Sequence, residues 1–427
     1  MASRPLESSA QIRRDLSAMW AAPVDVVDEA GAEARSSGGT VLHTFAVLPS
    51  TRRPRIVSSG SPTAAAAAVR RFSHSTGILG RSARVALGAA IRSGAVGLVF
   101  RDRLAVIGGA EGEGGAGSVV AALTEIFGTE VAIAMSVGSV RANRKPVLHV
   151  VTPEGATLGF AKLALSPLAR RLVQAEAKNL RLLADHDFEH LELPRVIHHG
   201  PWQTHELLVM TALHAPLRRR HGRNTLPVHA MAELAEVGGV STMPLAESSW
   251  FDGVLTASAE TSDPSARRLE RLLQRLAEHS GELAVRFGSW HGDWGPWNMV
   301  WAGDRVRLWD WERFAHGVPY GLDALHYALP AAPEDAQVAG LRAAAAKALA
   351  SFSVAADEAD LLLALYVTAL TARFLPDSLT EHGAQLRPRV VGLLDLLEAL
   401  PATGAGSRTA TSRSSEPARL DQEEVRR

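Results

Sequence analysis

One short stretch, SWHGDWGPWNMVW at residues 289–301, concentrates side chains that could do chemistry. It holds a His, an Asp, an Asn and four of the nine Trp residues of the chain within thirteen positions. Gly295-Pro296 marks a turn of the backbone. The sequence then reads as two strands, 300–301 and 305–311, which are joined by a tight turn.

The predicted hairpin would bring carboxylates together at its end. Side chains alternate between the two faces of a strand, so Asp310 and Glu312 would point the same way. Asp293 and Asn298 lie on the preceding loop, within reach of that end. Carboxylate and amide oxygens are hard ligands that suit Mg²⁺ better than zinc. The stretch therefore predicts a magnesium site beside a further Asp.

This arrangement resembles the catalytic segment of a known family. His-Gly-Asp, then Asn five residues after the Asp, then a hairpin into Asp-Trp-Glu is similar to the aminoglycoside phosphotransferase and choline kinase-like family, which phosphorylates small molecules. The resemblance implies an α+β fold with two protein-kinase-like lobes: a small antiparallel-sheet N-lobe and a mostly helical C-lobe. It implies ATP and Mg²⁺ as cofactors and a hydroxyl of a small molecule as phosphate acceptor.

The resemblance also implies roles for single residues. Asp293 would orient and deprotonate the acceptor hydroxyl, while Asn298 and Asp310 would bind Mg²⁺. Glu312 stands at the second acidic position of the Asp-x-Asp/Glu pattern, where the role is less constant. His291 would hold the loop together. Phosphoryl transfer needs little more than metal charge and one carboxylate that places the nucleophile.

A kinase-like site also needs a Lys on a strand, paired with a Glu on the following helix. Only four of the 45 basic residues are Lys: Lys145, Lys162, Lys178 and Lys347. Lys162 lies in the strand-like LGFAKLAL, and Glu176 follows fourteen residues later. At about 100° per residue, Glu176 falls in the middle of the apolar stripe of a helix over 167–185. A carboxylate that faces the core needs a cationic partner, so we expect Lys162 to pair with it.

The remaining parts of the ATP site are assigned from where they stand in the sequence relative to the family pattern. Backbone N–H groups of the Gly/Ser bend at Ser136, Gly138 and Ser139 could cap phosphates, although the bend could also be an ordinary hairpin turn. The apolar strand HELLVMTAL, residues 205–213, stands where the family has its adenine-binding hinge. The hinge residues would be Met210, Thr211, Ala212 and Leu213.

Asp323 matches the Asp that often opens the next helix in the family and steadies the catalytic loop. Its alternative role is a plain helix N-cap.

The Trp residues bear on the acceptor. Trp294 directly follows Asp293, and it could face the acceptor or pack in the core. A Trp face suits a sugar ring or a cationic amine. We expect Trp297, Trp309 and Trp311 to pack in the core. The basic run LRRRHGR at 217–223 could meet an anionic acceptor or a membrane, but such runs are more often a solvated face.

The chain divides into five segments by composition and periodicity. We expect a poorly ordered lead-in, a separate N-terminal α+β region with a Gly-rich linker, the kinase-like N-lobe, the helical C-lobe with the catalytic loop, and a disordered tail. Their ranges are 1–40, 41–118, 119–213, 214–401 and 402–427. The family resemblance covers roughly 130–400 and leaves residues 1–118 without a role.

Composition bounds the class of protein. The formal net charge is zero, which argues against a dedicated nucleic-acid binder, and the absence of Cys excludes disulfides and Cys-ligated zinc. No secretory signal is visible at the N-terminus, and the apolar run 361–372 is too short to span a membrane. We expect a cytoplasmic protein, with peripheral membrane association and the oligomeric state left open.

Three other functions compete with a small-molecule kinase. A protein kinase would need His-Arg-Asp and a longer activation segment after Asp310. A metal-dependent phosphoesterase would need an upstream Asp-x-His, which does not occur before residue 291. A catalytically silent, kinase-like nucleotide-binding module is the remaining alternative, and ATP turnover would separate it from an enzyme. The acceptor itself, whether sugar, aminoglycoside, amino alcohol or lipid-linked glycan, stays open, as does the choice of ATP or GTP.

Overall fold

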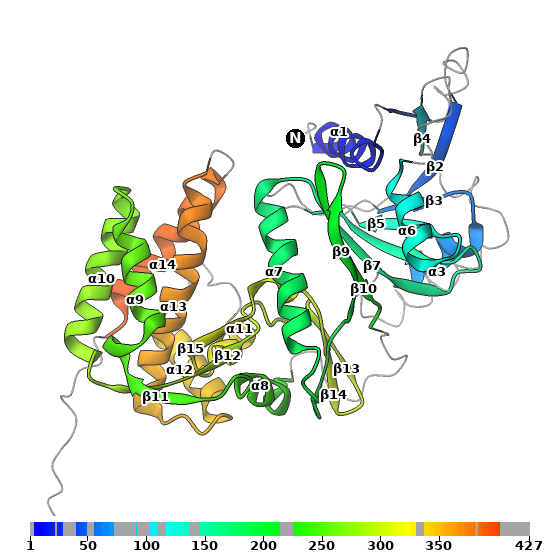
Figure 1. Cartoon of the computed structure of the whole chain (residues 1–427). Coiled ribbons are helices and arrows are strands. Elements are labelled where there is room, and N and C mark those ends of the chain that lie inside the picture. The colour runs from blue at the N-terminus through cyan, green and yellow to red at the C-terminus, as the bar shows by residue number, and fades with distance from the viewer. Residues whose placement is uncertain are drawn as a thin grey trace, which may run out of the picture.

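The structure is a computed structural model, and it describes residues 4–21, 24–28, 40–48, 55–71, 91, 102–108, 117–136, 145–213, 225–329, 337–380 and 383–401. Figure 1 shows two lobes, one built around a large β-sheet and the other mostly helical. This is the α+β, two-lobed architecture expected from the sequence.

The first lobe is built on a nine-stranded sheet in the order β1-β4-β2-β3-β5-β6-β7-β10-β9. Every neighbouring pair is antiparallel. The strands are β1 (Asp25–Asp28), β2 (Thr40–Leu48), β3 (Arg55–Ser58), β4 (Arg103–Gly108), β5 (Ala132–Ser136), β6 (Val147–Val151), β7 (Thr157–Ala164), β9 (Val196–Trp202) and β10 (His205–Thr211).

The N-terminal strands extend this sheet and do not form the separate region expected for 41–118. β3 pairs with β5, where Ile56 lies opposite Met135. The Ser58 hydroxyl bridges the two strands, donating to the carbonyl of Ile133 at 3.0 Å and accepting from its N–H at 3.2 Å. Pairing gives the backbone of β5 hydrogen-bond partners that an edge strand would lack. The expected boundary at residue 118 therefore does not divide the sheet.

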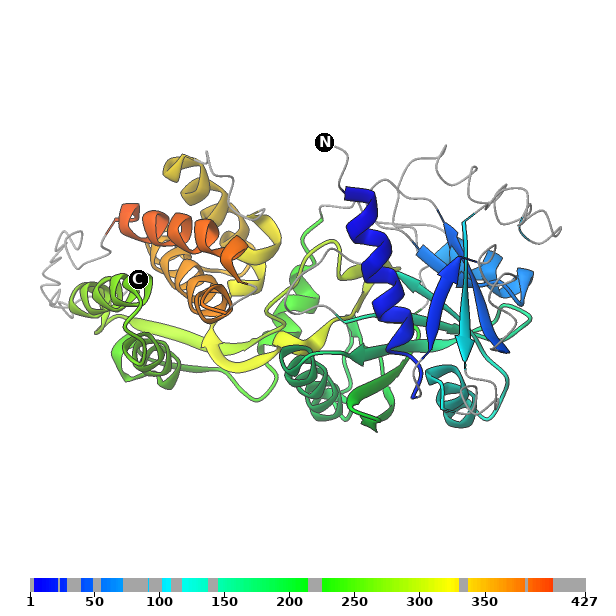
Figure 2. The ribbon, with the colours of Figure 1, turned by 90° about the horizontal axis from the view of Figure 1, so that it is seen from above.

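The lead-in is also more ordered than expected. Residues 4–17 form α1 (Arg4–Ser17), whose Ile12 and Leu16 belong to one core with strand residues such as Phe45 and Val209. Figure 2 shows α1, in dark blue, lying against the β-rich lobe. The short helix α6 (Val119–Phe127) adds Leu123 to the same core. The expected tail 402–427 lies outside the described residues.

The opposite face of the sheet is covered by α7 (Pro167–Leu183), which the sequence predicts at 167–185. Ser166 caps its first turn by accepting from Ala169 N at 3.2 Å, and Pro167 opens it. The stripe predicted from the 3.6-residue period is buried and includes Glu176. The helix thus presents a carboxylate to the sheet face that carries Lys162.

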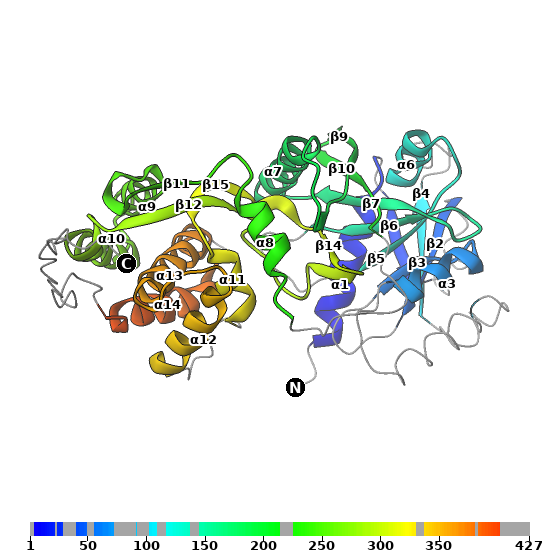
Figure 3. The same ribbon diagram turned by 90° about the horizontal axis from the view of Figure 1, so that it is seen from below.

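The second lobe is mostly helical with two three-stranded sheets, β11-β12-β15 and β13-β14-β8. Its strands are β8 (Leu191–Glu192), β11 (Ser241–Pro244), β12 (Ala284–Trp290), β13 (Met299–Ala302), β14 (Arg305–Leu308) and β15 (Ala315–Pro319). The helices are α8 (Val228–Ala235), η1 (Leu245–Glu247), α9 (Ser249–Ala259), α10 (Pro264–Ser280), η2 (Trp311–Arg313), α11 (Leu322–Ala328), α12 (Val338–Ala350), α13 (Ala356–Ser378), η3 (Ala384–Leu386) and α14 (Arg387–Ala399). Figure 3 shows α8 between the β-rich lobe and the C-terminal helices.

The apolar run 361–372 lies within α13, which is longer than the sequence suggests. Residues 358–378 are long and apolar enough to cross a membrane, but 72% of the apolar window is buried inside the protein. The helix packs in the largest core of the C-lobe. Its apolar composition is therefore accounted for by packing.

The integration of α1 into the sheet core can be tested by Leu16→Ala. Leu16 is fully buried, so we expect a loss of about 2–5 kcal/mol in the free energy of unfolding. The control is Leu182→Ala, because Leu182 lies on α7 and is 49% exposed. Chemical denaturation followed by Trp fluorescence would show one transition moved to lower denaturant if the sheet is one unit. A new early transition that leaves the main one in place would show that the N-terminal region unfolds separately.

Candidate active site

The catalytic loop predicted from HGDWGPWN connects β12 to β13, and its backbone is held by Asp323. The two carboxylate oxygens of Asp323 accept from His291 N at 2.6 Å and from Gly292 N at 3.1 Å. The N-cap of α11 is Gly321, so Asp323 is not the N-cap of this helix. Gly292 has φ +80°, and a Cβ there would lie 2.6 Å from the carbonyl oxygen of Arg313. The loop therefore needs glycine at this position.

Asp293 is held from both sides. Asn298 Nδ2 donates to Asp293 Oδ2 at 2.8 Å and to its backbone carbonyl at 2.9 Å. His326 Nε2 lies 3.1 Å from Oδ1, where it must donate because a carboxylate only accepts. Burial raises the pKa of Asp293, but the hydrogen bond and charge of His326 outweigh it and hold the pKa below its usual range. Asp293 is therefore ionised at neutral pH.

The hairpin differs from the expected one in its last residues. β14 ends at Leu308, Asp310 has left-handed backbone angles of φ 76° and ψ 57°, and residues 311–313 form η2. Asp310 and Glu312 therefore do not lie on a strand, and the prediction that strand alternation points them the same way is wrong. Their carboxylates nevertheless converge with that of Glu176, with oxygen atoms within 4.8 Å of one another. The 3₁₀ turn, rather than a strand, aims them at one point.

Lys162 contacts a carboxylate on α7 and a second carboxylate just before η2. Its Nζ lies 2.7 Å from Glu176 Oε1, 2.5 Å from Oε2 and 2.7 Å from Asp310 Oδ1. Burial lowers the pKa of Lys162, but the two carboxylates outweigh it and raise the pKa above its usual value. Burial raises the pKa of Asp310, and Lys162 more than offsets that effect. The ion pair expected between strand and helix is thus present, with Asp310 added to it.

Two residues of the site had no role in the sequence-based prediction. Lys145 forms an ion pair with Glu312 and is 10% exposed. Its rarity among the basic residues was the available signal. His326 stands one turn after Asp323 on α11, and its Nδ1 lies 3.2 Å from Tyr366 OH. His326 could have been noticed in the sequence because it lies one helical turn after Asp323, the residue expected to steady the catalytic loop.

The other predicted nucleotide contacts are described only in part. Gly138 and Ser139 lie outside the described residues, and Ser136 is the last residue of β5. Met210 and Thr211 end β10, where Thr211 N donates to the carbonyl of Arg195 at 2.9 Å. Ala212 and Leu213 follow the strand. The basic run 217–223 also lies outside the described residues.

The Trp residues are distributed differently from expectation. Trp294 is fully buried and its Nε1 donates to Met299 Sδ at 3.4 Å, so it does not face an acceptor. Trp297 is 54% exposed and not in the core; its ring lies edge-on to His326 at 6.2 Å. Trp311 is fully buried, as expected, and packs against the ring of His291 at 4.8 Å. The exposed aromatic side chain beside Asp293 is therefore Trp297.

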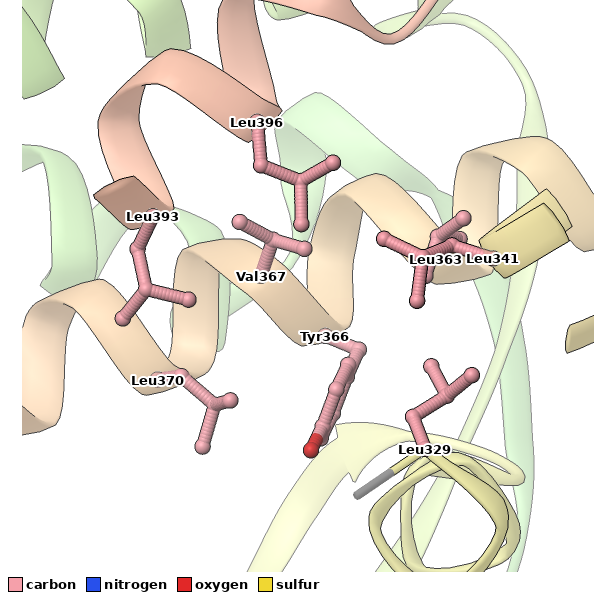
Figure 4. A pocket seen from close by; sticks show the side chains of 8 residues that line it. All are labelled: Leu329, Leu341, Leu363, Tyr366, Val367, Leu370, Leu393 and Leu396. Atoms are coloured by element: carbon pink, nitrogen blue, oxygen red, sulfur yellow. The ribbon is translucent and has the colours of Figure 1, made fainter. Parts of the chain in front are cut away.

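A small cavity lies among the helices of the C-lobe, and Tyr366 lines it. Figure 4 shows it between α11, α12, α13 and α14, lined by Leu and Val side chains and by Tyr366. Its volume of about 20 Å³ is enough for a single water molecule. A larger groove of about 430 Å³ lies on the first lobe between β2 and α6, where Trp20 and His43 line it. Neither contains the groups assembled around Asp293 and Lys162.

The loop anchor predicts a pH dependence of stability. Burial raises the pKa of Asp323 to about 7 despite its two N–H partners. The folded state then keeps a proton that the unfolded state has lost, so this group makes the protein less stable as pH rises from about 4 to 7. We expect the stability difference between the parent and Asp323→Asn to fall on the order of 2–4 kcal/mol over that window. Denaturant unfolding of both proteins at pH 5, 6 and 7 measures it, and a constant difference would contradict the raised pKa.

Solved structures share part of this fold at 10–14% sequence identity. No family model matches the chain, and no curated protein matches it.

Three solved structures illustrate the likeness. A thermostable mutant of the aminoglycoside phosphotransferase APH(4)-Ia has a TM-score of 0.45 and 14% identity, with 68% of this chain and 100% of that one covered. A fructosamine-3-kinase of Haemophilus somnus gives 0.39 and 14%, covering 66% and 96%. The amicoumacin kinase hAmiN gives 0.40 and 10%, covering 62% and 89%. The first of them is an aminoglycoside phosphotransferase by name.

Proposed function

We propose that the protein is an ATP-dependent phosphotransferase that moves the γ-phosphate to a hydroxyl of a small molecule. One observation carries the proposal: Lys162 contacts Glu176 and Asp310 while Asp293 stands on a separate, anchored loop. A cation on a strand, a carboxylate at a hairpin end and a base on a loop are the groups that phosphoryl transfer requires.

The donor set fits a magnesium ion. Asp310 and Glu312 offer carboxylate oxygens, and Asn298 uses its amide nitrogen toward Asp293, so its amide oxygen is the ligand atom it can offer. These are hard oxygen donors of the kind that Mg²⁺ prefers. In this proposal Asn298 and Asp310 hold the ion, which would neutralise charge on the nucleotide phosphates.

In the proposed reaction, some residues would bind the nucleotide and others would orient the acceptor. Lys162, positioned by Glu176, would hold the nucleotide phosphates. Asp293 would accept a hydrogen bond from the acceptor hydroxyl and orient its oxygen toward the γ-phosphate. His326 and Asn298 would keep the Asp293 carboxylate in one orientation, because each donates to a different oxygen of it. Met210 to Leu213 would meet the adenine.

The direct test is an ATP-consumption screen over hydroxyl acceptors: sugars, aminoglycosides and amino alcohols. Turnover that depends on one acceptor class supports the proposal and names the substrate. ATP binding without turnover on any acceptor would favour a catalytically silent nucleotide-binding module. No ATP binding at all would contradict both.

Asp293→Asn is expected to separate catalysis from binding. The substitution keeps the shape of the side chain and removes the charge that orients the hydroxyl, so phosphate transfer should fall by about 10²–10⁴-fold. Affinity for Mg–ATP should stay within a few-fold of the parent. Asp304→Asn, at the exposed turn of the hairpin, is the control. Transfer at the parental rate would remove Asp293 from the reaction.

Asp310→Ala is expected to abolish the contribution of the metal to nucleotide binding. Calorimetry with and without Mg²⁺ should show tighter ATP binding with metal in the parent and little gain in the variant, because a carboxylate ligand is lost. Asp304→Ala should retain the full gain. Metal-independent binding by the parent would refute the assignment of Asp310.

A further inference from the structure

We propose that Lys145 is a second phosphate-binding lysine. Its ammonium group pairs with Glu312 in the structure, and in this proposal it turns to the terminal phosphates when Mg–nucleotide binds. This inference rests on the proposed function.

Sheet register places Lys145 on the same face as Lys162. Val147 of β6 lies opposite Lys162 of β7, and Leu163 N donates to the carbonyl of Pro146 at 3.1 Å. Directly opposite residues share a face, and side chains two apart along an extended chain do so too. Lys145, two residues before Val147, is thus directed to the sheet face that meets α7 and η2. Lys162 on β7 and Lys145, two residues before β6, reach the same acidic cluster.

The charges of the cluster explain why Lys145 is there. The carboxylates of Glu176, Asp310 and Glu312 lie together, and two ammonium groups face them, which leaves one formal negative charge. The side chains of Lys145 and Glu312 are only 10% and 8% exposed. Removing Lys145 would leave a buried carboxylate without a cation, which is costly. Lys145 therefore supplies positive charge to a carboxylate that would otherwise need another cation.

A bound metal removes that need. A divalent ion held by Asn298 and Asp310, beside Glu312, would bring the positive charge that Lys145 supplies, and like charges repel at such short distances. The ammonium group of Lys145 sits on a flexible four-carbon stem, so it can leave Glu312 without a change in the sheet. Phosphate oxygens that arrive with the metal are the acceptors that then suit it.

The test is Lys145→Met, with two measurements that should move in opposite directions. Affinity for Mg–ATP should fall about tenfold or more, as expected for a lost charge-assisted hydrogen bond, while affinity for adenosine stays unchanged. Binding of Mn²⁺ alone, followed by electron paramagnetic resonance, should become tighter because the cluster has lost a competing cation. A residue that only supports the fold would not strengthen one ligand and weaken the other.

Lys178→Met is the matched control, because Lys178 lies on α7 and is exposed. Lys145→Arg, which keeps the charge, should retain most of the Mg–ATP affinity. Glu312→Gln gives an independent reading if Lys145→Met does not fold: it releases Lys145, so metal-free ATP should bind more tightly than to the parent.

The outcomes separate the two proposals. A parent protein that binds no Mg–ATP overturns the proposed function. A parent that binds Mg–ATP while Lys145→Met binds it equally well overturns the role of Lys145 alone. Weaker binding of both Mg–ATP and Mn²⁺ in Lys145→Met would also overturn it, since that result marks a general loss of site structure.

Discussion

The contact of Lys162 with Glu176 and Asp310 is the interaction on which the rest of the site depends. It joins a strand, a helix and the end of a hairpin, and Glu176 is fully buried. Removing one member of such a buried group typically costs 3–5 kcal/mol, because the other charges are left uncompensated. The packing of α7 on the sheet and the position of η2 are therefore tied to one ammonium group. Asn179 strengthens this link by donating to the carbonyl of Trp311 at 2.8 Å.

A second constraint acts on the loop that carries Asp293. Asp323 accepts hydrogen bonds from the backbone N–H groups of His291 and Gly292, which directly precede Asp293. Arg373 donates to the carbonyl of Gly292. Side chains from α11 and α13 thus bind the loop backbone where it bends. Asp293 is positioned by the C-lobe and the lysines by the first lobe, so relative movement of the lobes would change the distance between the proposed donor and acceptor sites.

Local patterns were enough to predict part of this arrangement. A 3.6-residue period put Glu176 on the buried stripe, and the five-residue spacing put Asn298 beside Asp293. The left-handed conformation of Asp310 could not be predicted, since it follows from tertiary contacts and not from residue type. The burial of Trp294 and the exposure of Trp297 could not be predicted either, because both flank the same Gly-Pro turn.

The pairing of the N-terminal strands could not be predicted from local patterns either, because the paired residues are far apart in the sequence. The pairing of β3 with β5 joins positions such as Ile56 and Met135 across the sheet, and the Gly-rich segment between them suggested a boundary. Periodicity identifies a strand but not its partner, which depends on which edge is left unpaired. Lys145 illustrates the point at the level of one side chain. Its rarity drew attention to it, but only the register of β6 against β7 shows where it is directed.

The ionisation of Asp293 bears on how the proposed reaction would proceed. Its lowered pKa makes it a weak base, so it is poorly suited to removing a proton from a hydroxyl before phosphate transfer begins. Phosphoryl transfer through a loose transition state makes little demand for early deprotonation, because the nucleophile gains charge late. In the proposed reaction, an ionised Asp293 carboxylate held by His326 and Asn298 would serve mainly to direct the acceptor oxygen. In the proposed reaction, Lys162 and a metal ion held by the neighbouring carboxylates would supply the positive charge that the phosphates need, while Asp293 on the other lobe would direct the acceptor.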